Sequence, residues 1–298
     1  MKPLLLVASL LALATAMPSH AFDFGNGVTV TGEFEQEFVR SDNGTNRAFG
    51  FATADIAFQQ PVGSFGGFVG FDAYRFDGDG EAAVYGALSF SGSFGKIQVG
   101  VPRAVIDDYL ETPVLGNFRL LDLELGTLQS SFLTTLYMSF GINPPLGLRY
   151  DGSIGNARIG VSYHKVDDGS LLDAAINYQV NNVVLRAGLE HARGAADSGT
   201  TVSIGVNASF GTVETGLLLT DASYINEYRA TKLFATYRPT ERLEVTGTML
   251  SVKNSSGTNS LFGLAADYTF AHGAFIQAGV ASGSDADGIY NISLGLKF

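Results

Sequence analysis

The chain has 298 residues and a formal net charge of −11 at neutral pH, with no cysteine. The acidic balance argues against nucleic acid as a partner, and the missing cysteine excludes a fold held by disulfides. Glycine is abundant (37) and proline sparse (8), with 22 phenylalanines and 12 tyrosines. This composition is typical of many aromatic-rich strands joined by tight turns.

The N-terminus has the features of a secretory signal. Met1 and Lys2 are followed by an apolar run from Leu4 to about Ala16, and small residues stand at Ser19 and Ala21. We predict a signal peptide over residues 1–21 and a mature domain over 22–298. The apolar run is too short to favour a membrane anchor, and no later stretch has the 18 apolar residues of a spanning helix. The mature chain is therefore either soluble or crosses a membrane as strands.

The dominant pattern of the mature chain is a period-two alternation of apolar and polar residues. In the last strand, Tyr290, Ile292, Leu294, Leu296 and Phe298 share one face, and polar residues or glycine occupy the other. The pattern predicts about sixteen strands, which lie near 28–38, 46–60, 65–76, 81–91, 94–101, 146–152, 156–165, 172–180, 183–192, 201–210, 212–220, 227–238, 242–253, 260–270, 273–281 and 290–298.

The strand lengths favour a membrane over a soluble sandwich. Ten tilted residues rise roughly 25 Å, which matches the apolar band of an outer membrane, whereas sandwich strands are usually shorter. We predict an all-β fold, a transmembrane antiparallel up-and-down β-barrel of about 16 strands that encloses an aqueous channel. The apolar faces should point outward to lipid and the polar faces inward to water.

One connection breaks the rhythm. From Pro102 to about Pro145 the alternation stops, and an irregular segment of this length in a compact fold is usually functional. It follows the fifth strand, so it is the third long loop at the rim opposite the chain ends.

With these features the sequence resembles the trimeric general diffusion porins of Gram-negative bacteria. The resemblance rests on the signal peptide, the even strand count, the long third loop and the terminal strand Asn291–Phe298. It implies a homotrimer in the cell outer membrane, surrounded by lipid and lipopolysaccharide. It further implies that Phe298 is read by the barrel assembly machinery, and that the third extracellular loop, residues 103–145, folds into the lumen as a constriction loop.

The resemblance also implies an acidic loop that faces a basic wall. The loop would supply Asp107, Asp108, Glu111, Asp122 and Glu124. Alternation places Arg149, Arg158 and Arg186 in the lumen, because a lipid-facing arginine at mid-bilayer costs about 2–4 kcal/mol. The loop departs from the pattern by carrying Arg103 and Arg119 of its own. The full set of basic wall candidates is Arg40, Arg75, Arg149, Arg158, Lys165, Arg186 and Arg229.

These charges predict a water-filled channel for passive diffusion of small hydrophilic solutes and ions, without a cofactor. Rings of lumen charge bias ion choice. The surplus of acids, including Glu33, Glu35 and Glu37 on one lumen face, predicts a mild preference for cations. Structural Ca²⁺ at an Asp-rich loop such as Asp77–Asp79 is a weaker expectation, since Asp-Gly is first of all a turn.

Two other classes of function remain open from the sequence. A barrel enzyme, either protease or lipase, would need a converging catalytic set. The mature chain offers only His164, His191 and His272, none with a partner recognisable by spacing, and the acidic pair Asp107–Asp108. A ligand-selective or structural surface barrel would show a plugged lumen. Conductance in planar bilayers separates both from a channel.

Overall fold

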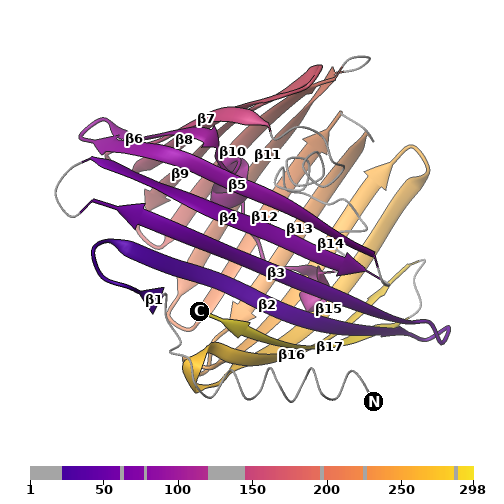
Figure 1. Ribbon diagram of the computed structural model, residues 1–298. Helices are drawn as coiled ribbons and strands as arrows, with labels where there is room; N and C mark the ends of the chain where they lie inside the picture. The colour runs from indigo at the N-terminus through magenta and orange to yellow at the C-terminus, as the bar shows by residue number, and fades with distance from the viewer. Residues whose placement is uncertain are drawn as a thin grey trace.

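The computed structural model describes residues 22–60, 64–76, 79–119, 145–194, 198–223, 227–284 and 288–298. Sixteen long antiparallel strands form one sheet that closes on itself into a barrel, and Figure 1 shows them steeply inclined around a common axis. Among the described residues, no helix is long and apolar enough to cross a membrane. The predicted barrel and its strand number are confirmed. The strands are β2 (Val28–Ser41), β3 (Asn46–Gln59), β4 (Phe65–Phe76), β5 (Asp79–Gly92), β6 (Gly95–Val101), β7 (Leu146–Ile154), β8 (Ala157–Val166), β9 (Gly169–Val180), β10 (Val183–Arg193), β11 (Ser198–Phe210), β12 (Val213–Ala222), β13 (Tyr228–Tyr237), β14 (Leu243–Asn254), β15 (Gly257–Thr269), β16 (Ala274–Gly283) and β17 (Ile289–Lys297).

The barrel closes where the last strand meets the first long one. β17 pairs with β2 from Ile289 opposite Ser41 to Lys297 opposite Glu33. The ladder extends one residue further, because the backbone N–H and C=O of Phe298 both bond to Gly32, at 2.9 and 2.7 Å. A short strand, β1 (Phe22–Asp23), adds to the start of β2. Closure leaves no open edge at this seam, as strands in lipid require.

The two rims of the barrel differ. The rim that holds both described chain ends, called here the short-turn rim, has tight connections such as Asn181–Asn182 between β9 and β10. It also carries a short 3-10 turn, η2 (Ala271–Gly273). The opposite rim, called the long-loop rim, is where the third loop departs after β6. This loop contains the helix α2 (Val105–Tyr109) and the 3-10 turn η1 (Leu115–Asn117).

The side-chain distribution is the reverse of a soluble core. On β8, Val161 and Tyr163 point outward and are 44% and 42% exposed, whereas Ser162 and His164, which alternate with them, point inward and are buried. β11 repeats this, with exposed Val202 flanking buried Ser203. Apolar residues on the outer surface suit lipid, and polar residues inside suit water. The predicted orientation of the two faces is confirmed.

Candidate functional site

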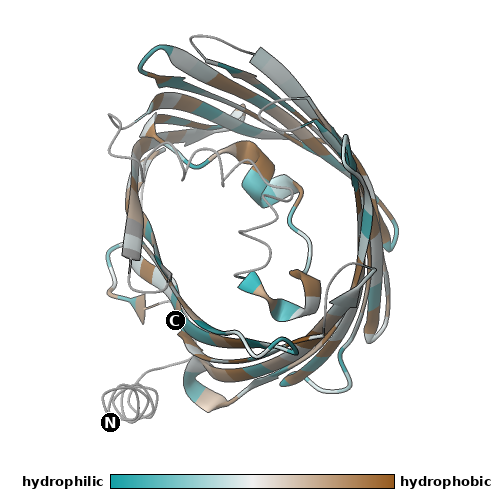
Figure 2. Cartoon of the chain, turned by 90° about the vertical axis from the view of Figure 1, so that its right-hand side faces the viewer, coloured by the Kyte–Doolittle hydropathy of each residue, from teal (hydrophilic) through white to brown (hydrophobic). Residues whose placement is uncertain are grey.

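The third loop leaves the wall early and turns into the barrel. β6 ends at Val101 after seven residues, and in the view of Figure 2 the loop lies inside the ring of strands. Its first residues are fastened to β8. The Pro102 carbonyl lies 2.8 Å from His164 Nε2, and the Val105 N–H donates to Ser162 Oγ at 3.1 Å. The expectation of a long third loop folded into the lumen is confirmed for its described part, residues 102–119.

The helix α2 docks on the inner face of β8, β9 and β10. Tyr109 and Leu110 are fully buried there, over Gly160 and Gly188. A Cβ on Gly188 would lie 2.6 Å from a methyl carbon of Leu110, and one on Gly160 would lie 3.0 Å from the Tyr109 ring. The missing side chains therefore give the loop its room on this wall, called here the α2 seat.

The turn η1 docks on the wall across the lumen, formed by β14, β15 and β16. Gly116, at φ 56°, brings its backbone against two wall glycines. A Cβ on Gly279 would lie 1.9 Å from the Gly116 carbonyl oxygen, and one on Gly263 would lie 2.5 Å from the Gly116 nitrogen. The Gly116 N–H donates to Thr248 Oγ1 at 3.2 Å. This contact is called the η1 seat.

Because the two seats belong to different walls, the segment between them, residues 111–114, crosses the lumen. Asn117 extends the second contact by donating to the carboxylate of Asp267, and its carbonyl accepts a bond of 2.8 Å from Asn291. The loop thus divides the cross-section of the barrel rather than lining one side of it.

Two loop arginines neutralise acids of the wall formed by β2, β3 and β4. Arg103 pairs with Asp55 at 3.0 Å and Asp72 at 2.6 Å. Arg119 pairs with Glu33 and with the fully buried Glu35. Burial lowers the pKa of both arginines, but their hydrogen bonds and ion pairs with these carboxylates outweigh it and raise each pKa above the usual value. Both loop cations therefore stay charged.

Aromatic rings complete both arginine contacts. The Arg103 guanidinium lies 4.2 Å from the centre of the Tyr85 ring, and Arg119 lies 4.4 Å from that of Phe51. Such stacking adds favourable energy where the cation is partly desolvated. The loop is therefore held by its positive charges on this wall.

On β7 the charges are arranged the other way, with the base on the wall and the acid on the loop. Arg149 pairs with Asp108 of the loop and with Asp151 of its own strand, and it donates to the carbonyls of Arg103 and Ala104 at 3.2 and 3.3 Å. Arg158 covers the Tyr109 ring at 4.3 Å. The predicted acidic loop against a basic wall thus describes the β7 side, while the β2–β4 side has acids on the wall and arginines on the loop.

The structure divides the predicted wall cations into two groups. Arg149, Arg158 and Arg186 face the lumen. Arg40, Arg75, Lys165 and Arg229 have the outward parity of their strands, each near the long-loop rim, and are exposed. The prediction of a wall position is wrong for these four. A cation at a strand end reaches water or headgroups, so the cost that forces a mid-bilayer arginine inward is nearly absent there.

The predicted acids follow their expected faces where they are described. Glu33, Glu35 and Glu37 face inward on β2, and the last two are fully buried. Asp107 and Asp108 lie on α2, and Glu111 follows it. Asp122 and Glu124 lie outside the described residues, as do residues 1–21 and the Asp77–Gly78 part of the suggested Ca²⁺ loop. Among the described residues, no cluster of three His, Cys, Asp or Glu could hold a metal.

The histidines occupy structural positions. His164 is fully buried under the start of the loop, and His191 points outward beside Thr200, whose hydroxyl lies 3.0 Å from Nδ1. His272 sits at positive φ in η2. The structure brings none of the three together.

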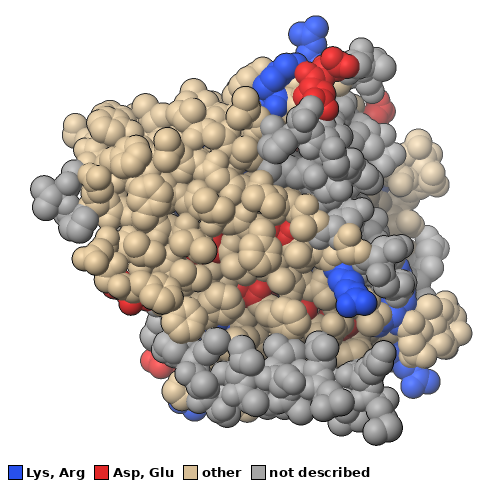
Figure 3. All heavy atoms as spheres, viewed as in Figure 1, with Lys and Arg blue, Asp and Glu red and all other residues tan. Residues whose placement is uncertain are grey.

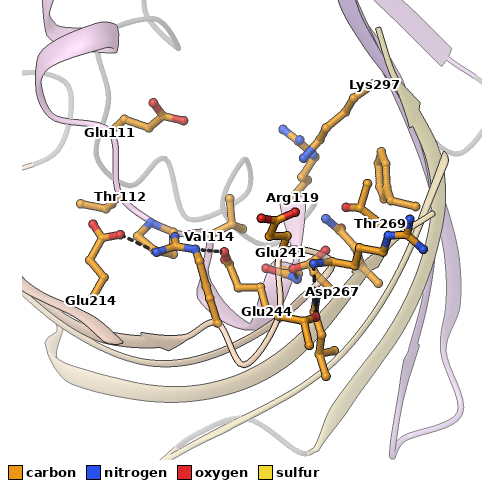
Figure 4. A pocket seen from close by; sticks show the side chains of 18 of the residues that line it. Glu111, Thr112, Val114, Arg119, Glu214, Glu241, Glu244, Asp267, Thr269 and Lys297 are labelled. Atoms are coloured by element: carbon orange, nitrogen blue, oxygen red, sulfur yellow. Dashed lines mark hydrogen bonds and ion pairs between the residues drawn. The ribbon is translucent and has the colours of Figure 1, made fainter. Parts of the chain in front are cut away.

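A cavity of about 590 Å³ lies between the crossing segment and the wall on the short-turn side of the loop (Figure 4). Arg238 bridges Glu214 at 3.0 Å and Glu244 at 2.7 Å on its wall. Arg186 donates to the Glu111 carbonyl at 2.7 Å and has no carboxylate within ion-pair distance in the described part of the chain. The charged residues that line the cavity are Asp108, Glu111, Arg119, Arg186, Glu214, Arg238, Glu241, Arg242, Glu244, Asp267 and Lys297.

Several of these residues were not among the sequence predictions. Glu214, Glu244, Asp267 and Lys297 all have the inward parity of their strands, so alternation alone could have placed them. The docking of Arg103 and Arg119 on acids far apart in sequence had no local signal.

A closed barrel with an apolar outer face, a polar lumen and a docked internal loop defines a β-barrel channel of the bacterial outer membrane. The chain belongs to the Gram-negative porin family, whose model matches residues 8–288. A search of curated protein sequences finds no match.

Solved structures share the fold at low sequence identity. A mutant of the porin from Rhodobacter blastica is 16% identical, with a TM-score of 0.72, over 91% of this chain and all of that one. The Vibrio cholerae outer membrane protein OmpT in its trimer form is 15% identical, with a TM-score of 0.68, over 91% of this chain and 99% of that one. A loop-deletion mutant of OmpT is 14% identical, with a TM-score of 0.67, over 91% and 99%.

Proposed function

We propose that this porin passes small hydrophilic solutes and ions by passive diffusion, with a mild preference for cations, and performs no covalent chemistry. The observation that carries the proposal is a polar lumen narrowed by a loop that crosses from the α2 seat to the η1 seat. A solute must pass beside residues 111–114, where Arg186 and Glu111 lie close together and Arg238 bridges two glutamates.

The lumen is more acidic than it is basic. Inward-facing acids on the described strands outnumber inward-facing bases, and rings of like charge favour the counter-ion. The acids are Glu33, Glu35, Glu37, Asp55, Asp72, Asp151, Asp173, Glu190, Glu214, Glu244 and Asp267; the bases are Arg47, Lys96, Arg149, Arg158, Arg186, Lys232 and Lys297.

The ion pairs divide these charges by role. Arg103, Arg119 and Arg149 are committed to carboxylates that hold the loop, so they contribute little net field to the passage. Arg186 and the Glu111 carboxylate have no ion-pair partner among the described residues and line the cavity. We therefore assign the largest influence on ion choice to these two.

The test is conductance and reversal potential in planar bilayers under a salt gradient. The folded protein should give large ohmic steps whose size follows bulk salt, with a small cationic reversal potential. Arg186→Gln should raise the cation preference and Glu111→Gln should lower it. Arg242→Gln, in an exposed turn at the mouth of the cavity, is the matched control and should shift the potential least.

Two results would contradict the proposal. Correctly folded protein without any conductance would favour a plugged structural or ligand-selective barrel instead. Shifts of the reversal potential in the same direction for Arg186→Gln and Glu111→Gln would show that these two residues do not determine ion preference.

We further propose that the channel is a homotrimer assembled by the barrel machinery, with the long-loop rim facing outward. The support is the family and the trimer form of the structurally similar OmpT. Conductance steps that close in threes, and a molecular mass of three chains in detergent, are the expected measurements.

A further inference from the structure

Two hydrogen-bond donors beside the crossing segment, residues 111–114, have no acceptor. Arg186 Nε, on β10, and Thr112 Oγ1, in the crossing segment, are both buried and make no hydrogen bond within the described part of the chain. They lie close together, because the Arg186 side chain donates to the carbonyl of Glu111, the residue next to Thr112, at 2.7 Å. Buried polar atoms almost always have a partner, so two such atoms at one place indicate a position for an acceptor oxygen from outside the chain.

Arg186 keeps one edge of its guanidinium group for such an oxygen. Nη1 is used by the Glu111 carbonyl, and Nη2 makes no hydrogen bond to any described residue. The remaining edge, formed by Nε and Nη2, has the spacing that a planar carboxylate accepts with two parallel hydrogen bonds. Arg186 and Thr112 both line the cavity of about 590 Å³, so a solute in the passage can reach them.

An unpaired negative charge lies beside these donors. The Glu111 carboxylate is exposed, has no ion-pair partner among the described residues and projects into the lumen near Thr112 in Figure 4. The carboxylates of Glu214 and Glu244, on the wall of the same cavity, are neutralised by Arg238. A simple anion would gain from the free guanidinium edge and lose to Glu111, whereas a solute with charges of both signs can satisfy both.

The other arginines at the loop are already engaged. Arg103, Arg119 and Arg149 each pair with two carboxylates. In the part of the chain that the structure describes, Arg186 contacts the loop without a carboxylate partner. The outer wall, in the face seen in Figure 3, is mostly uncharged. Arg186 is therefore the loop-contacting arginine that a solute in the lumen can use.

We propose that Arg186, Thr112 and Glu111 form a binding subsite for α-amino acids, so that the passage of these dipolar solutes saturates. The solute carboxylate lies on the free edge of Arg186, one of its oxygens accepts from the Thr112 hydroxyl, and the α-ammonium faces the Glu111 carboxylate. A small shift of the guanidinium and a rotation of the hydroxyl bring both donors to the solute. The inference rests on the proposed channel function and names a solute class for it.

The experiment measures the flux of labelled solutes into liposomes that contain the purified, folded full chain. Three probes of similar size separate the charges: L-glutamine, 4-carbamoylbutanoate, which lacks the ammonium, and 4-aminobutanamide, which lacks the carboxylate. The flux of glutamine should saturate with concentration, whereas the flux of the other two should stay linear over the same range.

Two variants test the donors. Thr112→Val should raise the half-saturation concentration of glutamine about fivefold, which corresponds to the loss of one hydrogen bond. Arg186→Lys should raise it about tenfold, because a lysine carries the charge but has no planar edge for a carboxylate.

The matched control is Thr269→Val. Thr269 lines the same cavity from β15, on the side away from Thr112 in Figure 4, so the half-saturation concentration should not change. Linear glutamine flux through protein that conducts ions would overturn the subsite and leave the channel proposal standing. Equal saturation by glutamine and 4-carbamoylbutanoate, or unchanged saturation in both test variants, would also overturn it.

Discussion

Four inward glycines determine where the loop lies. Gly160 and Gly188 accommodate Tyr109 and Leu110, and Gly263 and Gly279 accommodate the backbone of η1. At Gly188, Gly263 and Gly279 the loop and the wall approach each other more closely than a Cβ would permit, and at Gly160 a Cβ would make a tight contact of 3.0 Å. The position of the loop at these glycines depends on the available space and on hydrogen bonds of backbone groups rather than on charge.

Gly279→Ala tests the η1 seat. The added methyl would meet the Gly116 carbonyl at 1.9 Å, so the turn must move off the wall into the passage. We expect lower single-channel conductance and a loss of about 1–3 kcal/mol in stability, the usual cost of overpacking. Gly247→Ala is the control, because a Cβ at Gly247 meets nothing within 4 Å. Unchanged conductance for Gly279→Ala would show that the η1 seat does not position the loop.

Arg119→Gln tests the loop cations. The change leaves the buried Glu35 beside Glu33 without a full counter-charge, which costs about 3–5 kcal/mol when one partner of a buried pair is removed. We expect a lower unfolding midpoint in urea and a stronger cation preference. Arg119→Lys should recover part of both, since it restores the charge. A variant as stable as the unaltered protein would refute the stabilising role.

At the residue scale, the sequence predicted the direction of a basic side chain correctly only where the cost of facing lipid allowed a single orientation. Arg149, Arg158 and Arg186 alternate with apolar residues and face inward as predicted, whereas Arg75 and Arg229 also stand between apolar residues but face outward at the long-loop rim. Arg40 and Arg229 lie near the ends of their strands. Their lumen position was predicted from the family resemblance, whereas the alternation of each strand places them outward, as observed.

At the scale of elements, the loop is a separate structure inside a complete barrel. Each long strand of the barrel pairs with its neighbours without help from residues 105–119, so the wall and the loop are built by different interactions. Removing the loop should therefore leave the strand order and the closure of the barrel intact.

Deletion of residues 105–140 tests this separation. The exclusion limit for sugars in liposome swelling should increase because the crossing segment is gone. Cation preference should fall, because the deleted segment carries five acids, Glu111 among them, and a single base, Arg119. An unchanged exclusion limit would mean that the loop does not narrow the passage.

The interrupted alternation of residues 102–145 predicts that the loop exists, but it does not predict the α2 seat or the η1 seat. A seat joins residues far apart in the chain, such as Gly116 and Gly279, and a glycine in a strand gives no sign of what approaches it. Only the assembled barrel shows which inward glycines face the loop.

For the whole molecule, the last residue completes the ring. Phe298 bonds through both backbone groups to Gly32, and its ring centre lies 5.8 Å from that of Phe22. We expect deletion of Phe298 to lower the yield of folded barrels, measured as the heat-modifiable band in electrophoresis. Phe270→Ala, at an exposed turn residue, is the control. Equal yields would show that Phe298 contributes to folding neither by closing the seam with Gly32 nor as an assembly signal.

The global fold was the most predictable feature because its signal is local and repeated. A period of two decides which face each residue takes, and sixteen repetitions of one rule tolerate errors at individual strand ends. The asymmetry of charge between lipid and lumen belongs to the same scale. This asymmetry can be recognised only after each base has been assigned to the lipid face or the lumen face from the alternation of its strand.

The glycine seats have a consequence for how such a channel can be altered. We expect the aperture to depend on the methyl-sized gaps at Gly263 and Gly279, and we have proposed that ion preference depends on Arg186 and Glu111. On this proposal, the dimensions of the opening and its electrical character are encoded by different amino acids. Either property can be retuned by one substitution while the other is kept.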